Sequence, residues 1–440
     1  MSDALPDNWA TSELRDILAS DFPGAWGDDP SSRKANVNVL RSTNLDDEGH
    51  LDYSTGALRF FTFRDLERKR LSSGDILLEA SGGGPGKPVG RVALFRQTDD
   101  QTYACSNFFR TLRPTKDVDC GYLAWYLQWV YSQPNIWKFQ QQTTGIINLK
   151  YKDYLRQPIA LPDLTEQRMI SKILDTADEV IRSTELIIDK LEQAKQGIVH
   201  DLLTRGISEF GDLRDPSRSD TFVGTKLGLV PRDWRIVSVT DTASKSRGSL
   251  VIGPFGSDLV ASDYRNSGVP VIFVRDVRPD DFTWISEVYL SVEKATELSE
   301  HKVRPGDLVI TKMGLPPAIA AVYPDGLPTG IVTADIIRLR PDDDTVTSFW
   351  LSLAINSDST RRQIAAITGG VTRPKITLRD FRRILIALPS RGEQQAISDL
   401  VQTLMSELAA VRWKRDKLLL LKRGLLDDLL TGRVRVGASG

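Results

Sequence analysis

Residues 161–170 read LPDLTEQRMI and residues 388–397 read LPSRGEQQAI, so one pattern opens two segments of the same chain. The match continues without a gap over 161–206 and 388–433, where 16 of 46 positions are identical. Both copies close on the tetrapeptide Asp-Leu-Leu-Thr. A repeat at a fixed spacing indicates that the chain consists of two structurally similar halves.

The repeat extends upstream with small changes in spacing. Three shorter matches carry it, namely 5–9 with 230–234, 74–77 with 306–309 and 39–41 with 273–275, at offsets of 225, 232 and 234. Such a drift indicates insertions and deletions in loops. We therefore expect a first head at 1–160, a central long helix in 161–208, a linker at 209–228, a second head at 229–387, a C-terminal long helix in 388–433 and a tail at 434–440.

The two repeated segments have the periodicity of long helices. From Ile170 to Ile198, apolar or small residues recur in alternating steps of three and four, which predicts a heptad seam through Val180, Ile187 and Ala194. The second copy follows the same register from Ile397 to Leu425, with charged residues at Glu407 and Lys414. Capping boxes are expected at 165–168 and 390–393, and left-handed caps at Gly206 and Gly432.

Charge favours pairing of the two helices with each other. Segment 163–206 has 9 acidic and 6 basic residues, whereas segment 390–433 has 6 acidic and 8 basic residues. Opposite net charges favour an antiparallel pair within one chain, and two separate homodimeric coiled coils remain the alternative. Gly197 and Gly424 would permit close helix approach, or they are simply tolerated helix glycines.

The remaining halves show the pattern of mixed α/β heads. Strands are expected at 37–40, 74–78, 90–95, 269–274, 307–311 and 336–340, and helices at 122–131 and 348–355. The aromatic residues in those helices are expected in the core. The predicted fold class is thus α+β, with two α/β heads in a pseudo-two-fold arrangement, separated by two long helices that form an antiparallel coiled coil.

Composition bounds the class of protein. The 440 residues carry 57 Lys+Arg and 58 Asp+Glu, which excludes a uniformly basic nucleic-acid coat but not a local basic groove. Two cysteines and three histidines predict neither a disulfide framework nor a zinc site. No apolar run is long enough to span a membrane and no signal peptide precedes the first head, so we expect a cytoplasmic protein.

The segments that resemble enzyme motifs lack residues that those motifs require. Residues 81–88, SGGGPGKP, resemble a phosphate loop, but Ser81 replaces the opening glycine and Pro88 replaces the Ser or Thr that would hold magnesium. No Gly-x-Gly-x-x-Gly opens a helix after a strand, and no Asp/Asn-Pro-Pro-aromatic tetrapeptide of an amino-methylating enzyme is present. We expect no catalytic site, no metal and no cofactor on this chain.

Two different heads held apart by a rigid spacer suit a two-part site on duplex DNA. Proteins with two-fold symmetry that bind duplex DNA contact two half-sites. These half-sites are separated by one helical turn, about 34 Å, or by a multiple of it. Because the heads differ in sequence, the half-sites should differ as well. The sequence therefore favours recognition of an asymmetric, bipartite DNA target.

The whole chain resembles the specificity subunits of type I restriction–modification enzymes. The residues that carry the resemblance are 161–170, 190–198 and 201–206 with their second copies, supported by 253–257, 262–264 and 268–272. The resemblance implies two target-recognition domains and an antiparallel coiled coil without catalysis. It also implies two methyltransferase subunits that use S-adenosylmethionine on adenine N6, and motor-nuclease (restriction) subunits. Ser390-Arg391-Gly392 departs from the sequence with which this segment opens in the family. The charged seam positions Glu407 and Lys414 also depart from the family's pattern.

Polar and glycine-rich loops are the candidates for DNA contact, because phosphate and base-edge contacts use Arg, Lys, Ser, Thr, Asn and backbone N–H groups. The candidates in the first head are Arg41, Ser42, Thr43, Asn44, Ser81, Gly82, Gly83, Lys87, Thr143, Thr144, Gly145, Asn148 and Lys150. Those in the second head are Gly256, Ser257, Arg275, Lys312, Gly369, Gly370, Thr372, Arg373 and Lys375. The loop at 372–375, with two cations beside two glycines, is the strongest of them.

Two other functions stay open on the sequence alone. The heptads permit a coiled-coil scaffold whose two heads bind proteins. An enzyme with an unrecognised active site is the other alternative, against which the failed motifs argue.

Overall fold

The structure is a computed structural model that describes residues 5–30, 35–83, 86–97, 99–143, 145–209, 211–218, 220–368 and 374–436. The chain divides into two compact units. Unit 1 comprises Met1–Leu186 and Arg412–Gly440, and unit 2 comprises Ile187–Val411. Each unit therefore contains one head and half of each long helix, so the two are described separately.

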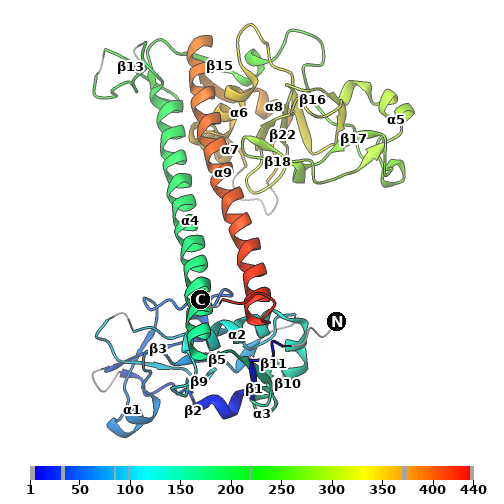
Figure 1. The fold of residues 1–440 in the computed structure, drawn as a ribbon. Helices are drawn as coiled ribbons and strands as arrows, with labels where there is room; N and C mark the ends of the chain where they lie inside the picture. Colours follow the sequence, from blue (N-terminus) through cyan, green and yellow to red (C-terminus); the bar gives the residue numbers. More distant parts are fainter. Residues whose placement is uncertain are drawn as a thin grey trace. The chain divides into compact units, whose positions relative to one another are not determined.

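Unit 1 contains two sheets (Figure 1), and side chains from both, such as Leu40 and Leu77, belong to one buried cluster. The first sheet has the order β2 (Leu18–Pro23), β9 (Phe109–Pro114), β5 (Ile76–Glu79) and β7 (Val92–Leu94). The second has the order β4 (Ala57–Arg59), β3 (Val37–Leu40) and β8 (Tyr103–Cys105), in which β3 and β8 are parallel.

Smaller elements complete unit 1. β1 (Ala10–Glu13) pairs with β12 (Pro158–Leu161), and β10 (Gln140–Thr143), β11 (Ile146–Leu149) and β6 (Ser81–Gly83) form a third sheet. The helices of this head are α1 (Phe63–Lys69), α2 (Cys120–Ser132) and α3 (Tyr151–Tyr154).

Unit 2 repeats this topology. Its first sheet has the order β16 (Leu250–Ile252), β25 (Ile336–Leu339), β22 (Leu308–Thr311) and β23 (Ala320–Val322). Its second has the order β20 (Tyr289–Leu290), β17 (Val269–Ile272), β24 (Gly330–Val332) and β21 (Lys302–Val303), with β17 and β24 parallel.

The rest of unit 2 also follows the first head. β15 (Arg235–Ser238) pairs with β26 (Leu385–Leu388) as β1 pairs with β12. β13 (Phe222–Thr225) and β14 (Gly228–Pro231) form a hairpin that begins inside the expected linker, and β18 (Val277–Arg278) pairs with β19 (Asp281–Phe282). The helices are α5 (Val292–Glu297), α6 (Ser348–Asn356), α7 (Asp358–Thr368) and α8 (Leu378–Arg382). The two heads therefore share one fold, as the repeat predicts.

Central strands that are apolar throughout explain the layering. In β22, Leu308 and Ile310 face the cluster that contains Trp350 of α6, whereas Val309 faces the cluster that contains Ile272 of β17. Side chains alternate between the two faces of a strand, so a strand buried on both sides needs a continuous apolar run. All six predicted strands overlap observed ones, and the two predicted helices lie in α2 and α6.

The long helices are α4 (Leu164–Arg205) and α9 (Arg391–Leu430). In unit 1, Ile170 and Leu174 of α4 share a core with Leu429 and Leu430 of α9, so the start of one helix packs with the end of the other. In unit 2, Leu202 shares a core with Ile397 and Val401 in the same sense. Gly206 and Gly432 follow the two helices at φ 66° and 74°, which confirms the predicted left-handed caps.

Part of the predicted seam is displaced by one residue on the buried face of each helix, whereas Ile170, Thr184 and Ile397 on the same seam are buried as predicted. On α4, Ile181 and Ile188 are buried, whereas Val180 and Ile187 are exposed. On α9, Leu408 rather than Glu407 is buried. The displaced positions in full are Val180, Ile187, Ala194, Ile198, Leu400, Glu407, Lys414 and Leu421, all of which are exposed. The period was predicted correctly and these positions were wrong, so Glu407 and Lys414 do not interrupt the buried seam.

The first helix start differs from the predicted capping box, whereas Ser390 caps the second helix as predicted. Asp163, not Thr165, accepts the backbone N–H of Glu166 at 2.9 Å, and Ser390 accepts that of Glu393 at 3.3 Å. The glutamates turn away from their own helix ends towards the heads. A Cβ added at Gly197 or Gly424 would meet nothing within 4 Å among the described residues, so those glycines are tolerated without close helix approach.

A buried glutamate fastens each head to its helix. In unit 1, the Glu166 carboxylate accepts Trp9 Nε1–H at 3.2 Å and Arg435 at 2.8 Å. In unit 2, the Glu393 carboxylate accepts Trp234 Nε1–H at 3.0 Å and also binds Arg214. The repeated glutamate thus joins three separate segments of chain within each unit.

The neighbouring glutamine has the same role in both copies. Gln167 Oε1 accepts the N–H of Asp119 at 2.9 Å, and Gln394 Oε1 accepts the N–H of Thr347 at 2.9 Å. Asp119 and Thr347 are the N-caps of α2 and α6, so each glutamine fixes the start of that helix on the long helix. The repeated Glu-Gln pair is therefore structural.

Candidate nucleic-acid interface

The turn after β3 holds four of the candidates in the first head. Asn44 is 2% exposed; its Oδ1 accepts the N–H of Arg41 at 2.8 Å, and its Nδ2 donates to Thr55 Oγ1 at 2.8 Å. Arg41 donates from Nη2 to the carbonyl of Thr55 at 2.6 Å. Thr43 is exposed and Ser42 is partly exposed. The buried asparagine shapes this turn, and Thr43 is its most accessible side chain.

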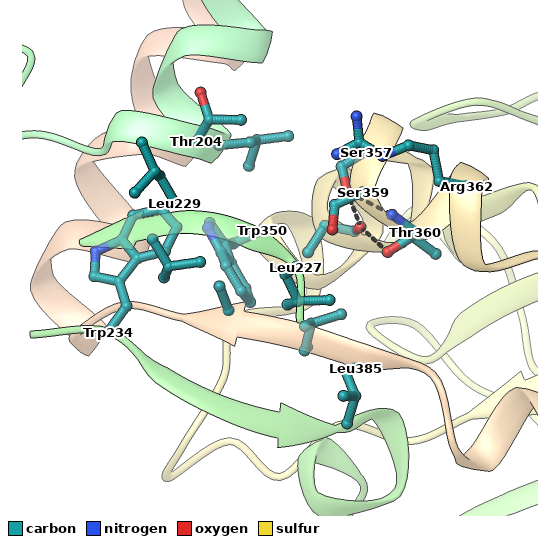
Figure 2. Close-up of a pocket in the computed structure, with 15 residues that line it drawn as sticks. Thr204, Leu227, Leu229, Trp234, Trp350, Ser357, Ser359, Thr360, Arg362 and Leu385 are labelled. Atoms are coloured by element: carbon teal, nitrogen blue, oxygen red, sulfur yellow. Dashed lines mark hydrogen bonds between the residues drawn. The ribbon is translucent and has the colours of Figure 1, made fainter. Parts of the chain in front are cut away.

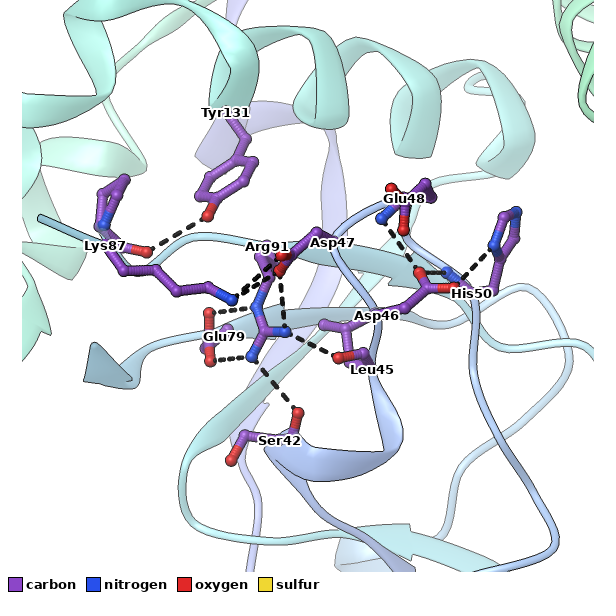
Figure 3. A network of polar contacts seen from close by, with 11 residues as sticks. Ser42, Leu45, Asp46, Asp47, Glu48, His50, Glu79, Lys87, Arg91 and Tyr131 are labelled. Carbon is purple, nitrogen blue, oxygen red and sulfur yellow. Dashed lines mark hydrogen bonds and ion pairs between the residues drawn. The ribbon is translucent and has the colours of Figure 1, made fainter. Parts of the chain in front are cut away.

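Arg91 holds the following loop in place (Figure 3). Its guanidinium binds both oxygens of Glu79, at 2.9 and 2.6 Å, and donates to the carbonyls of Leu45 at 2.7 Å and Ser42 at 3.3 Å. The hydrogen bond that Arg91 donates to Glu79 is the main cause that raises the pKa of Arg91. Arg91 was missed by the sequence analysis, because nothing in the run VGRVAL distinguishes it from a solvated strand residue.

Lys87 belongs to the same network of polar contacts as Arg91. Its Nζ is 2.8 Å from Asp47 Oδ1, and the hydrogen bond from Lys87 lowers the pKa of Asp47. Both side chains are more than half exposed, so this ion pair is readily opened by a competing anion. Lys87 and Ser42 are thus placed on one surface of the first head by Arg91 and Asp47.

The third sheet of unit 1 joins a second group of candidates. Ser81 pairs with Asn148 and Gly83 with Ile147 between β6 and β11, and Ser81 Oγ donates to Asn148 Oδ1 at 2.6 Å. Thr143 ends β10 in the same sheet, and Gly82 and Gly145 have φ of 117° and 85°. The exposed Lys150 follows β11. Thr144 lies outside the described residues.

In the second head, Arg275 follows β17 in a short 3-10 turn whose shape is fixed by Asp276. The Asp276 Oδ2 accepts the N–H of Phe273 at 2.8 Å, just as Asn44 accepts that of Arg41. The structural counterpart of Arg41 is therefore Phe273, and the sequence match of 39–41 with 273–275 is two residues out of register. Arg275 donates from Nε to Ser286 at 2.8 Å, and its guanidinium lies 4.6 Å from the Phe273 ring.

The other described candidates of the second head converge on one surface. Met313 bridges to Lys375, and Ile376 N–H donates to the carbonyl of Lys312 at 2.9 Å, so the two lysines belong to adjoining segments. Gly256, Arg275 and Met313 line one cavity of about 500 Å³. Ser257 donates to its neighbour Asp258 at 3.1 Å. Gly369, Gly370, Thr372 and Arg373 lie outside the described residues.

The two surfaces are equivalent in the repeated fold. The Ser81–Asn148 pair and the Met313–Lys375 pair both join the segment after the central strand to the segment that precedes the last strand of the head. Different side chains thus stand at corresponding positions of one scaffold. Residues on corresponding positions can recognise different ligands of the same class without any change of fold.

A separate apolar pocket in unit 2 is too small for a ligand (Figure 2). Trp234, Trp350 and Leu229 line it, and its volume is about 50 Å³, against roughly 300–1,000 Å³ for ligand sites. In the part of the chain that the structure describes, no group of three or more His, Cys, Asp or Glu side chains could hold a metal ion. Within the same described ranges, no helix is long and apolar enough to cross a membrane.

Comparison with known proteins gives a consistent result. The putative type I restriction enzyme MjaX specificity subunit of Methanocaldococcus jannaschii is 23% identical over 441 residues, covering 98% of this chain and 95% of that protein. The type I restriction enzyme EcoBI specificity subunit of Escherichia coli is 22% identical over 285 residues, covering 63% and 57% of the two chains.

Solved structures share the fold. A chain in a structure of the type I R-M system has a TM-score of 0.56 at 17% identity, covering 98% of this chain and 100% of its own. The type I restriction–modification system S subunit from M. genitalium has a TM-score of 0.56 at 14% identity, covering 97% and 98%. The model of the type I restriction modification DNA specificity domain matches residues 6–193 and 264–417. Since these ranges make up more than half of the sequence, the chain belongs to the family of type I restriction–modification specificity subunits.

Proposed function

We propose that this chain reads an asymmetric, bipartite DNA target as the non-catalytic specificity subunit of a type I restriction–modification complex. The observation that carries the proposal is the doubled head, in which one topology presents different side chains at corresponding positions. Ser81 and Asn148 stand in the first head where Met313 and Lys375 stand in the second. A duplex offers distinct donor and acceptor patterns in its major groove, so two different surfaces read two different half-sites.

The spacer between the heads is an antiparallel coiled coil of α4 and α9. Its support comes from the opposed packing in each unit, where Ile170 meets Leu429 and Leu202 meets Ile397. A helix of 42 residues extends about 63 Å at 1.5 Å per residue. The target-recognition domains are then residues 1–160 and 229–387, joined by this rod in a pseudo-two-fold arrangement.

The same rod carries the docking surface for two methyltransferase subunits, with the restriction subunits joining that assembly. Several apolar side chains on the outer faces of the helices support this. Leu186 is 62% exposed and Ile187 is 50% exposed on α4, and Trp413, Leu420 and Leu421 are 64%, 61% and 57% exposed on α9. Exposed apolar residues in such number mark interaction surfaces. The methyltransferase subunits bring S-adenosylmethionine and the chemistry at adenine N6.

Within the heads, lysine and arginine side chains hold phosphates and the neighbouring loops read base edges. Lys87 and Lys150 in the first head and Lys312 and Lys375 in the second supply phosphate contacts. In the first head, Thr43 supplies a polar side chain in the turn after β3. Phosphate contacts position a protein on DNA, whereas base contacts specify the sequence.

Mapping of methyladenine across the genome tests the proposal. The chain is co-expressed with the methyltransferase of the adjacent gene, and the methylated motifs are compared with those of a strain that lacks this chain. We expect one asymmetric two-part motif that disappears on deletion. Unchanged methylation would contradict the proposal and leave the scaffold with two protein-binding heads as the alternative.

A further inference from the structure

The cavity in the second head has the lining of a ligand site. Its volume is about 500 Å³, within the range of small-molecule sites. Tyr264, Phe273, Arg275, Met313 and Asp335 are among the residues that line it. It thus combines aromatic and thioether surface with one cation and one carboxylate.

The aromatic wall is arranged for a flat ligand. The rings of Tyr264 and Phe273 meet edge to face at 5.8 Å, and the Arg275 guanidinium lies over Phe273 at 4.6 Å. Aromatic rings and guanidinium planes are the surfaces on which unstacked bases pack. Asp335 offers a carboxylate, which accepts amino and imino N–H groups of a base.

Two exposed apolar side chains lie on segments that also contribute residues to the cavity lining. Phe255, adjacent to lining residues Pro254 and Gly256, is 81% exposed. Leu315, two residues after Met313, is 83% exposed. Both side chains are therefore free to contact a ligand that approaches this face of the head. In DNA-bending proteins, Phe and Leu enter the base stack as wedges and unstack a step.

Both loops are held by their backbones. A Cβ at Gly253 would lie 2.1 Å from the carbonyl oxygen of Thr333, so the loop before Phe255 is pressed on the neighbouring segment. Arg361 donates to the carbonyl of Pro317 at 2.7 Å and also to that of Ala318, which fastens the loop that carries Leu315. The exposed side chains are therefore presented on fixed supports.

We propose that the cavity receives one nucleobase displaced from the duplex, while Phe255 and Leu315 fill the gap left in the base stack. The inference rests on the proposed function and adds a binding site to it. Lys312 and Lys375 border the same surface and would hold the phosphates on either side. A displaced base is then read by Asp335 through its Watson–Crick edge.

The test uses the complex of the full chain with its methyltransferase subunits, bound to the mapped target. 2-Aminopurine replaces each base of the second half-site in turn. We expect a several-fold rise in fluorescence at one position other than the methylated adenine, because unstacking relieves quenching. The double variant Phe255→Ala/Leu315→Ala should lose that rise. Val292→Ala, which truncates a 65% exposed side chain of α5 in the same head, should keep it.

A mismatch at the same position gives a second readout. Because a mismatched base costs less to displace, the wild-type complex should bind that duplex about tenfold tighter, and the double variant should not. If the complex binds the duplex but no position shows the rise in fluorescence, the proposed base-binding site is refuted. The proposed function in DNA recognition is not affected by that result. Binding of free dGMP or dAMP without base displacement also overturns it. Failure to bind any duplex would refute the proposed function itself.

Discussion

His50 fastens the loop of the first head to α4 through a charged cluster. Its Nδ1 is 2.9 Å from Asp46 Oδ2, and its Nε2 is 2.7 Å from Asp178 Oδ2. Asp178 also binds Lys422 of α9. The hydrogen bond to Asp178, followed by that to Asp46, raises the pKa of His50 from 6.5 to about 9.

The expected loss of stability can be worked out from that change. A tenfold change in proton affinity corresponds to about 1.4 kcal/mol, so the ceiling is about 3 kcal/mol. The His50 side chain is 24% exposed, and solvent screening reduces the figure to about 2 kcal/mol. Because the folded-state pKa is raised, this stabilisation is fully present below pH 6.5 and is lost as the pH rises towards 9. His50→Gln should therefore destabilise unit 1 at pH 6 and have little effect above pH 9.

Hydrogen–deuterium exchange provides the assay. The difference in opening free energy between the variant and the wild type is measured in peptides around residues 45–52 and 174–182 from pH 6 to 9.5, where intrinsic exchange rates cancel. His200→Gln is the control, since His200 and Asp358 form a 3.0 Å pair that is 52% and 69% exposed. That variant should change stability by less than about 0.5 kcal/mol. A His50→Gln effect that does not vary with pH would refute the reasoning.

Three further outcomes follow from the second head. Glu393→Gln should destabilise unit 2 by about 3 kcal/mol, because Arg214 loses a buried charged partner. The midpoint of urea unfolding measures this loss, and an unchanged midpoint would contradict the role of Glu393 in fastening the head. Gly253→Ala should cost about 1–3 kcal/mol, since its Cβ would lie 2.1 Å from a backbone oxygen, whereas Gly256→Ala, with nothing within 4 Å, should be neutral in the same assay. Lys375→Ala should weaken DNA binding and reduce the slope of log affinity against log salt by about 1, and an unchanged slope would remove it from the interface.

The sequence predicted the period of the long helices but could not predict which of two neighbouring apolar residues faces inwards. Apolar residues occur as neighbours at Val180-Ile181 and Ile187-Ile188 on α4, and at Leu400-Val401 on α9. Either member of each pair satisfies a heptad, so periodicity alone cannot say which one faces inwards. Packing decides it, and the other member is left exposed.

The site was less accessible to sequence reasoning than the fold. Polar loops after strands were reasonable candidates, yet Asn44 proved to be buried and Arg91 was not considered. The partners of Arg91 come from residues 42–47 and 79, and only the topology of the sheets brings these together. Phe255 and Leu315 were equally out of reach, because no local pattern tells that an apolar loop residue stays exposed.

The contacts of Glu166 and Glu393 bear on how the chain is connected. In unit 1, Arg435 Nη1 donates to Asn8 Oδ1 at 2.7 Å, so segments from opposite ends of the numbering meet at the start of α4. In unit 2, Arg214 makes the equivalent contact with Glu393. It belongs to the continuous segment that links α4 to the second head. A circular permutant that joins 436 to 5 and is opened between 215 and 218, beyond Arg214, should keep both fastenings, with the heads encoded in reverse order.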